Sequence, residues 1–200
     1  MRVAIQKLVA VALAVSSLFA LSGCAASDPL AQQYKAGDNK NYIAGDGTVR
    51  EFAEENRGAP IEWVGTTESG GVLKSSQLTG VVVVMNFWYA GCAPCRAEAP
   101  ELVALNKEFT GQKVQFIGVN VRDSAATAAA FERKFNIVWP SIMDATSGSV
   151  LLAFTGVVTP QAVPTTLVID GKGRVSARVL GRIEKGTLKA LIKTAVSENK

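Results

Sequence analysis

The chain of 200 residues contains no histidine and only three cysteines. Zinc in proteins is usually held by four ligands from cysteine, histidine and carboxylate side chains. With no histidine and no further cysteine to complete such a set, the sequence argues against a tetrahedral zinc centre. We therefore expect neither a bound metal nor another cofactor.

An excess of charge of one sign is also missing. The chain carries 21 lysine and arginine residues against 17 aspartate and glutamate residues, a formal net charge of +4. Two of the basic residues, Arg2 and Lys7, lie in a segment that we expect to be removed, which leaves +2. This balance gives no reason to expect a nucleic-acid partner. A hydrophobic content of 48% is typical of a globular chain with a full core.

No apolar stretch near the N-terminus reaches the length of a membrane span. The stretch from Leu8 to Leu21 is shorter than the roughly 20 residues that a spanning helix needs. A basic start, an apolar stretch and small residues are typical of an export signal. One interpretation is plain secretion after cleavage near Ala20-Leu21-Ser22. We favour the other, because Leu-Ser-Gly-Cys resembles the lipobox of bacterial lipoproteins, in which the cysteine, here Cys24, is acylated.

Acylation of Cys24 would leave the other two cysteines, Cys92 and Cys95, as an even pair with no stray thiol. We predict a lipoprotein signal peptide over residues 1–23 and a polar, flexible tether over 24–58, rich in Gly, Asp and Asn. The folded domain is predicted over 59–200. The expected location is the cell membrane, with the chain lipid-anchored and facing the extracytoplasmic side, where disulfides persist.

Hydrophobic periodicity predicts an α/β domain. Continuous apolar runs indicate buried strands, and apolar residues at helical spacing indicate helices. The predicted strands are Ile61–Thr66, Gly71–Lys74, Val81–Tyr89, Val114–Val121, Thr165–Ile169 and Arg174–Leu180. The predicted helices are Ala93–Phe109, Ser124–Phe135, Ser149–Phe154 and Glu184–Val196. This order predicts a mixed central sheet flanked by helices.

The Cys-x-x-Cys pair follows the most apolar strand directly. We expect Cys92 at the start of a helix, with Pro94 in its first turn, where the missing N–H costs nothing. The free N–H groups there favour a thiolate. Cys95, one turn further on, can close a disulfide with Cys92, which suits thiol–disulfide exchange. Half of a metal site and an inert bridge are the other interpretations.

The segment Val-Met-Asn-Phe-Trp-Tyr-Ala-Gly-Cys-Ala-Pro-Cys-Arg-Ala-Glu-Ala-Pro, with Val163-Pro164-Thr165-Thr166 downstream, resembles the thioredoxin superfamily. Within it, residues 59–195 are similar to the TlpA/ResA-like membrane-anchored thiol–disulfide oxidoreductases of bacteria. The resemblance implies a thioredoxin-like fold with an N-terminal β-hairpin and an insertion around Val119–Asp144.

The resemblance also assigns roles to residues. It implies Cys92 as the attacking thiol and Cys95 as the resolving thiol. It implies that Pro164 follows a cis peptide bond and helps bind an extended substrate strand. We place Val163 and Trp88 beside it as substrate-binding residues, with Trp88 also packing around and shielding the site.

Glu98 lies three residues after Cys95, so a helix places it on the same side as that sulfur. A buried carboxyl group there could accept the Cys95 proton, and the resemblance implies such a role for a glutamate at this position. A solvated glutamate paired with Arg96 or another neighbour is the other interpretation. Asn86 occupies the position where cytoplasmic thioredoxins hold a buried acid, and it cannot titrate.

The direction of electron flow is less directly encoded. The intervening pair Ala93-Pro94 carries no cation to stabilise a thiolate, which favours a reducing couple. The resemblance implies reduction of exported proteins, above all apocytochrome c, with electrons drawn from a membrane donor. The alternatives are an oxidase or isomerase for secreted proteins, a copper-binding chaperone of related fold, and a peroxidase. Copper chaperones usually use Cys-x-x-x-Cys and a histidine, and peroxidases a different cysteine motif, so both are disfavoured.

Overall fold

The structure, a computed structural model, describes residues 49–158 and 162–199. The predicted signal peptide over 1–23, the predicted lipidation site Cys24 and the first part of the predicted tether lie outside these residues. Within the part that is described, no helix is both long enough and apolar enough to span a membrane.

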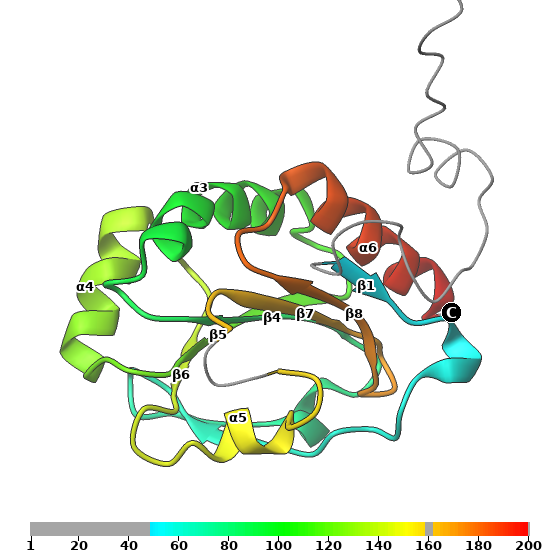
Figure 1. Ribbon diagram of the computed structural model, residues 1–200, viewed down its shortest axis with the longest axis horizontal. Helices are drawn as coiled ribbons and strands as arrows, with labels where there is room; N and C mark the ends of the chain where they lie inside the picture. Colours follow the sequence, from blue (N-terminus) through cyan, green and yellow to red (C-terminus); the bar gives the residue numbers. More distant parts are fainter. Residues whose placement is uncertain (1–48, 159–161, 200) are drawn as a thin grey trace, which may run out of the picture. The chain divides into compact units, whose positions relative to one another are not determined.

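A six-stranded mixed sheet forms the centre of the domain, in the order β1-β8-β7-β4-β5-β6 (Figure 1). Strands β4, β5 and β6 are parallel, and β7, β8 and β1 continue the sheet in antiparallel pairs. The strands are β1 (Val49–Glu51), β4 (Val82–Trp88), β5 (Val114–Asn120), β6 (Ser141–Met143), β7 (Thr165–Ile169) and β8 (Val175–Leu180). A separate hairpin, as predicted, joins β2 (Val64–Thr66) to β3 (Val72–Lys74).

Helices cover both faces of this sheet (Figure 1). On one face lie α3 (Ala93–Glu108), α4 (Ala125–Phe135) and α6 (Lys185–Glu198). The short helix α5 (Ser149–Ala153) and the β2–β3 hairpin lie on the other face. Two 3-10 helices complete the elements, η2 (Glu54–Asn56) and η3 (Ser75–Leu78). The α/β class and the flanked mixed sheet are confirmed.

Strand β4 is buried on both faces, as its sequence, apolar except for Asn86, predicts. Val82 and Val84 pack with α3 and α6 in one hydrophobic cluster. Met85 and Phe87 pack in a second cluster on the α5 side. Since β4 is held between β5 and β7, its carboxyl end is fixed from both sides, and this end carries the cysteine turn.

The predicted boundary between tether and domain at residue 59 is wrong. Residues Val49–Glu51 form the edge strand β1, which pairs with β8. Arg57 lies in the interior, where its guanidinium pairs with Asp170 at 3.1 Å and also with Glu198. A three-residue strand has too few positions to show periodicity, and an ion pair between residues so distant in sequence leaves no local pattern. The polar composition of residues 49–58 therefore led to the prediction of a flexible tether, although these residues belong to the domain.

The predicted insertion is present as helix α4 followed by strand β6 at the edge of the sheet. The Asn136 residue ends α4 in the left-handed conformation with φ 58°, which is a common way to end a helix. Strand β6 was not predicted, because its three residues follow Pro140 directly and are too few to show alternation.

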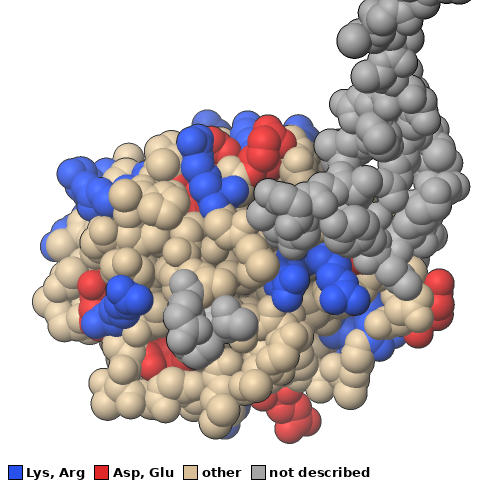
Figure 2. All heavy atoms as spheres, viewed as in Figure 1, with Lys and Arg blue, Asp and Glu red and all other residues tan. Residues whose placement is uncertain are grey.

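Charged side chains do not form a continuous surface of one sign on the face shown in Figure 2. Basic and acidic side chains gather there in small groups around a wide uncharged area. A nucleic-acid interface would present a stripe of positive charge instead. This face gives no support to nucleic-acid binding.

Candidate active site

The cysteine turn connects the end of β4 to the start of α3. Cys92 is the N-cap residue of α3, and its sulfur accepts a hydrogen bond from the Cys95 N–H at 3.2 Å. The Cys92 N–H in turn donates to the Tyr89 carbonyl at 3.1 Å. Pro94 lies in the first turn of the helix, where no partner for an N–H is lost. The predicted placement of Cys92 at the helix start is confirmed.

Cys92 and Cys95 are joined by a disulfide with an S–S distance of 2.06 Å and a Cα–Cα distance of 5.2 Å. Each cysteine is only 3% exposed, whereas Gly91, Ala93 and Pro94 around them are exposed. The backbone of the turn is therefore accessible to a protein partner, while the sulfurs lie just beneath it. In this oxidised state the pair can accept two electrons from a dithiol.

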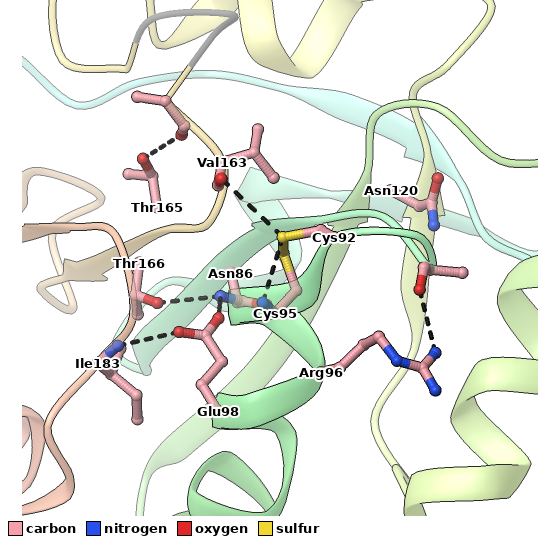
Figure 3. The surroundings of a disulfide bond; sticks show 12 residues. Asn86, Cys92, Cys95, Arg96, Glu98, Asn120, Val163, Thr165, Thr166 and Ile183 are labelled. Carbon is pink, nitrogen blue, oxygen red and sulfur yellow. Dashed lines mark hydrogen bonds between the residues drawn. A yellow bond between two sulfur atoms is a disulfide. The ribbon is translucent and has the colours of Figure 1, made fainter.

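The loop before β7 faces the disulfide (Figure 3). Its Val163–Pro164 peptide bond is cis, as predicted. The Val163 carbonyl oxygen lies 4.0 Å from the Cys92 sulfur, so the backbone of this loop borders the reactive atom. Val163 is half-buried and Pro164 is buried. The structure thus brings the two cysteines and the predicted substrate-binding residue Val163 together.

Glu98 lies in the interior on the side of α3 that faces the sheet and is 1% exposed. Its Oε1 accepts a hydrogen bond from Asn86 Nδ2 at 2.8 Å, and its Oε2 accepts one from the Ile183 N–H at 3.0 Å. Asn86 Nδ2 also donates to Thr166 Oγ1 at 3.0 Å. Figure 3 shows this carboxyl group and the Asn86 amide side by side next to the first turn of α3. The interpretation of Glu98 as a solvated residue paired with Arg96 is wrong.

Burial raises the pKa of Glu98 from 4.5 to about 7, because the charged form loses its hydration. The hydrogen bonds from Ile183 and Asn86 stabilise the carboxylate and oppose this rise, but burial has the larger effect. A carboxyl group with a pKa near neutrality can take up and release a proton under the conditions in which thiols exchange.

Trp88 does not have the position that we predicted for a substrate-binding residue. It is 3% exposed, and its ring lies 4.4 Å from that of Phe131, which α4 contributes. Both rings belong to a cluster that also contains Cys92 and Cys95. Trp88 therefore packs beneath the cysteines, as was also predicted, but it presents no surface to a substrate.

Two polar residues at the end of β5, Asn120 and Asp123, support the cysteine turn and were not among the predicted site residues. Asn120 ends that strand, and Asp123 follows three residues later. Asp123 accepts a hydrogen bond from the Ala90 N–H. Since β4 and β5 are parallel neighbours, their carboxyl ends lie at the same edge of the sheet. The signal in the sequence was the Asn-x-x-Asp pattern that begins at the last residue of β5.

Comparison with protein families shows a match over residues 57–178, more than half of the chain, to the model described as the AhpC/TSA family. Among individual proteins, the thiol-disulfide oxidoreductase ResA of Bacillus subtilis (strain 168) is 31% identical over 139 residues. That alignment covers 70% of this chain and 74% of ResA.

Two solved structures show the same fold. A DsbF homologue from Corynebacterium diphtheriae is 29% identical with a TM-score of 0.67, and the match covers 76% of this chain and 96% of that one. A secreted thiol-disulfide isomerase from Corynebacterium glutamicum is 26% identical with a TM-score of 0.70, with 79% and 98% covered. The predicted thioredoxin-like fold is confirmed by these neighbours.

Proposed function

Since the chain belongs to the AhpC/TSA family and is a thiol–disulfide oxidoreductase of the ResA type, we propose that it acts as a membrane-anchored disulfide reductase for exported proteins. The observation that carries the exchange chemistry in this proposal is the buried Glu98 carboxyl group, hydrogen-bonded one helical turn beyond Cys95. It supplies the proton acceptor that the second half of the exchange reaction needs.

The reaction starts from the reduced pair. The Cys92 thiolate attacks one sulfur of a substrate disulfide, and the helix N-terminus stabilises its negative charge. A new S–S bond then joins Cys92 to the substrate, and the other substrate sulfur leaves as a thiolate that takes up a proton. The exposed backbone around Gly91 and Ala93 leaves room for a protein to approach.

The second step needs Cys95 as a thiolate, although this cysteine is buried. In our proposal the Glu98 carboxylate takes the Cys95 proton. The Cys95 thiolate then attacks the Cys92 sulfur, the intramolecular disulfide closes, and the second substrate thiol is released. Two electrons have then passed from the enzyme dithiol to the substrate. The product is the disulfide form that the structure contains.

Substrate binding is proposed to use the loop that holds Val163 and Pro164. The Val163 carbonyl borders the Cys92 sulfur, so an extended substrate backbone lying along this loop would bring its own sulfur to Cys92. Val163 is half-buried, so the side chain can also contact a substrate. Shape and backbone contacts would then decide selectivity more than charge.

The proposed substrates are disulfide-bonded exported proteins such as apocytochrome c, whose two thiols must be free before haem attachment. The TlpA/ResA-like resemblance and the absence of a cation in Ala93-Pro94 support this direction. A thiol-transferring membrane protein would return two electrons to the Cys92–Cys95 disulfide after each turnover.

Anchoring is proposed to occur through lipid on Cys24. The Leu-Ser-Gly-Cys motif and the preceding apolar stretch support it. Labelling of cells with a radioactive fatty acid tests this directly. We expect the wild-type chain to carry label and to fractionate with membranes, and the Cys24→Ala chain to carry none. A labelled Cys24→Ala chain would contradict the proposal.

Covalent trapping of substrates tests the function. In a Cys95→Ser chain the mixed disulfide on Cys92 cannot be resolved, so partners stay attached and can be identified by mass spectrometry. We expect apocytochromes c and a membrane thiol donor, and no adducts in a Cys92→Ser, Cys95→Ser control. Adducts confined to disulfide-containing secreted proteins would favour the second candidate below.

The second candidate is an oxidase or isomerase for secreted proteins. Its support is the structural similarity to a protein described as a secreted thiol-disulfide isomerase. Deletion strains separate the two. A reductase predicts loss of cytochrome c assembly that the wild-type chain restores, whereas an isomerase predicts a defect in disulfide-bonded secreted proteins.

A further inference from the structure

The backbone of Ala90, two residues before Cys92, accepts and donates one hydrogen bond each with two side chains of opposite charge. Asp123 Oδ2 accepts a hydrogen bond from the Ala90 N–H at 2.6 Å. Arg96 Nη1 donates one to the Ala90 carbonyl at 3.2 Å. We propose that Asp123 and Arg96 are positioning residues that fix the cysteine turn and thereby lower the pKa of the Cys92 thiol.

The Asp123 carboxylate is itself held in place by a buried amide. Asn120 is fully buried, and its Nδ2 donates to Asp123 Oδ2 at 2.8 Å. The Asn120 Oδ1 accepts hydrogen bonds from the backbone N–H groups of Arg122 and Asp123 at 3.1 and 2.8 Å. Because Asn120 pairs with Trp88 in the parallel sheet, the support extends from β5 to the end of β4. The Asp123 carboxylate that binds the Ala90 N–H is therefore held in a fixed position by β5.

Arg96 closes the turn from the other side. Its backbone N–H donates to the Cys92 carbonyl at 3.1 Å, while its guanidinium reaches back to Ala90. The guanidinium also lies 5.5 Å from the centre of the Phe135 ring, at the end of α4. Within residues 49–158 and 162–199 Arg96 forms no ion pair with a carboxylate, so its contacts are directed at the turn and this ring.

These contacts have a consequence for the chemistry of Cys92. The N–H of Cys95 points at the Cys92 sulfur at 3.2 Å, and a thiolate at this place is stabilised only while the turn keeps that direction. Two hydrogen bonds on Ala90 limit the ways in which the turn can rearrange when the disulfide opens. The Asp123 bond comes from the β5–α4 segment, and the Arg96 guanidinium also lies over the Phe135 ring of α4, so in our proposal this part of the chain helps to set the reactivity of Cys92.

The charge of Asp123 alone would act in the opposite direction. A carboxylate near a thiolate raises the pKa of that thiol, so removal of the charge would make Cys92 more reactive. Loss of the hydrogen bond between Asp123 and the Ala90 N–H would make Cys92 less reactive. The two effects have different signs, and this difference separates positioning from electrostatics.

The test compares Asp123→Ala, Asp123→Asn and Ser124→Ala in the reduced, purified protein. Asparagine keeps an oxygen for the Ala90 N–H but removes the charge. Ser124 is the N-cap of α4, where its hydroxyl accepts from the Thr127 N–H, and it is the matched control because the loss of this bond weakens α4 without touching Ala90. Iodoacetamide alkylation of Cys92, followed by mass spectrometry from pH 5 to 9, gives the thiol pKa.

We expect Asp123→Ala to slow Cys92 alkylation at pH 7 by about three- to tenfold through a raised thiol pKa. Asp123→Asn and Ser124→Ala should stay within about twofold of wild type or, for Asp123→Asn, become faster. An Asp123→Ala rate equal to or above wild type would overturn the proposal. So would a Ser124→Ala rate as low as that of Asp123→Ala.

Arg96→Ala keeps the proposal testable should Asp123→Ala not fold. Arg96→Ala removes the hydrogen bond to the Ala90 carbonyl. An unchanged Cys92 thiol pKa in this variant would also overturn the proposal. The inference rests on the proposed role of Cys92 as the attacking thiol. Alkylation of Cys95 in place of Cys92 in the wild-type chain would refute that role, whereas equal rates at Cys92 would refute only the positioning.

Discussion

Replacement of Glu98 by glutamine removes the proposed proton acceptor while nearly keeping the shape of the side chain. The wild-type carboxylate accepts hydrogen bonds from Asn86 and from the Ile183 N–H. A glutamine oxygen can accept one of them, and its NH₂ group then faces the other donor. The unsatisfied contact should cost about 1–3 kcal/mol of unfolding free energy.

The pH dependence of stability follows from the raised pKa. The folded chain holds the Glu98 proton up to about pH 7, whereas the unfolded chain releases it near the ordinary value of 4.5. Between these values the folded state binds more protons, so the wild-type unfolding free energy falls as the pH rises. For this 1%-exposed group the fall is about 3 kcal/mol in total.

The Glu98→Gln chain lacks this fall. It should therefore be less stable than wild type at pH 5, by about 1–3 kcal/mol, and equal or more stable at pH 8. Urea unfolding of the oxidised proteins at both pH values measures the difference. The result that would refute the burial argument is a stability difference that stays the same at pH 5 and pH 8.

The same variant tests the mechanism when Ellman's reagent serves as the substrate. Attack by Cys92 releases a first coloured thiolate, and attack by Cys95 on the mixed disulfide releases a second. The rate of the second phase should rise with pH through about 7 in wild type, following the ionisation of Glu98. In Glu98→Gln it should be about a hundredfold slower at pH 7.5 and recover above pH 9, where the thiol ionises unaided.

A neighbouring glutamate provides the matched control. Glu101 lies in the same helix but nearer the surface, where it pairs with Arg182 at 2.6 Å. The Glu101 charge adds to the rise of the Glu98 pKa but has less effect than burial, so Glu101→Gln should move the inflection only slightly, toward lower pH, and keep the second-phase rate within about twofold of wild type. A second phase in Glu98→Gln that keeps the wild-type inflection near pH 7 would refute the role of Glu98.

Two further substitutions test the packing around the site and the corrected domain boundary. Arg57→Met removes the buried guanidinium that pairs with Asp170 and Glu198, while Asp170 keeps its ion pair with Arg174 at 2.9 Å. The unfolding free energy in urea should therefore fall by about 1.5–3 kcal/mol, with Cys92 alkylation unchanged; a loss below about 1 kcal/mol would mean that residues 49–58 are not part of the domain. Gly118→Ala would place its Cβ 2.2 Å from Ser141 Oγ and 2.7 Å from Trp88 Nε1, so we expect a loss of about 1–3 kcal/mol by calorimetry, and an unchanged melting temperature would contradict this close contact.

The sequence was most informative where local patterns are strong. Strand β4 and helix α3 were predicted to within one residue at each end, because a nine-residue run with eight apolar residues and a following Cys-Ala-Pro-Cys leave little ambiguity. The hairpin between β7 and β8 was predicted from Asp170-Gly171-Lys172-Gly173, and Gly173 indeed has φ 80°. Glycine adopts this conformation without strain.

The sequence was least informative where distant residues meet. The Arg57–Asp170 pair joins residues more than a hundred positions apart, and the sequence around either residue does not indicate its partner. The same holds for Asp123 and the Ala90 N–H, which only the parallel pairing of β4 and β5 brings together. The prediction for Trp88 failed because the local sequence around an aromatic residue near a reactive cysteine does not show whether the side chain contacts a substrate or packs in the interior. Here it packs against Phe131.

The reduction potential of the Cys92–Cys95 couple tests the central claim most directly. It is measured by equilibrating the purified protein with defined thiol–disulfide buffers at pH 7 and quantifying the alkylated fraction. A reductase should have a potential below about −230 mV, in the range of thioredoxin and the more reducing glutaredoxins. A value near about −120 mV, as in a strong oxidant, would contradict the proposed direction of electron flow.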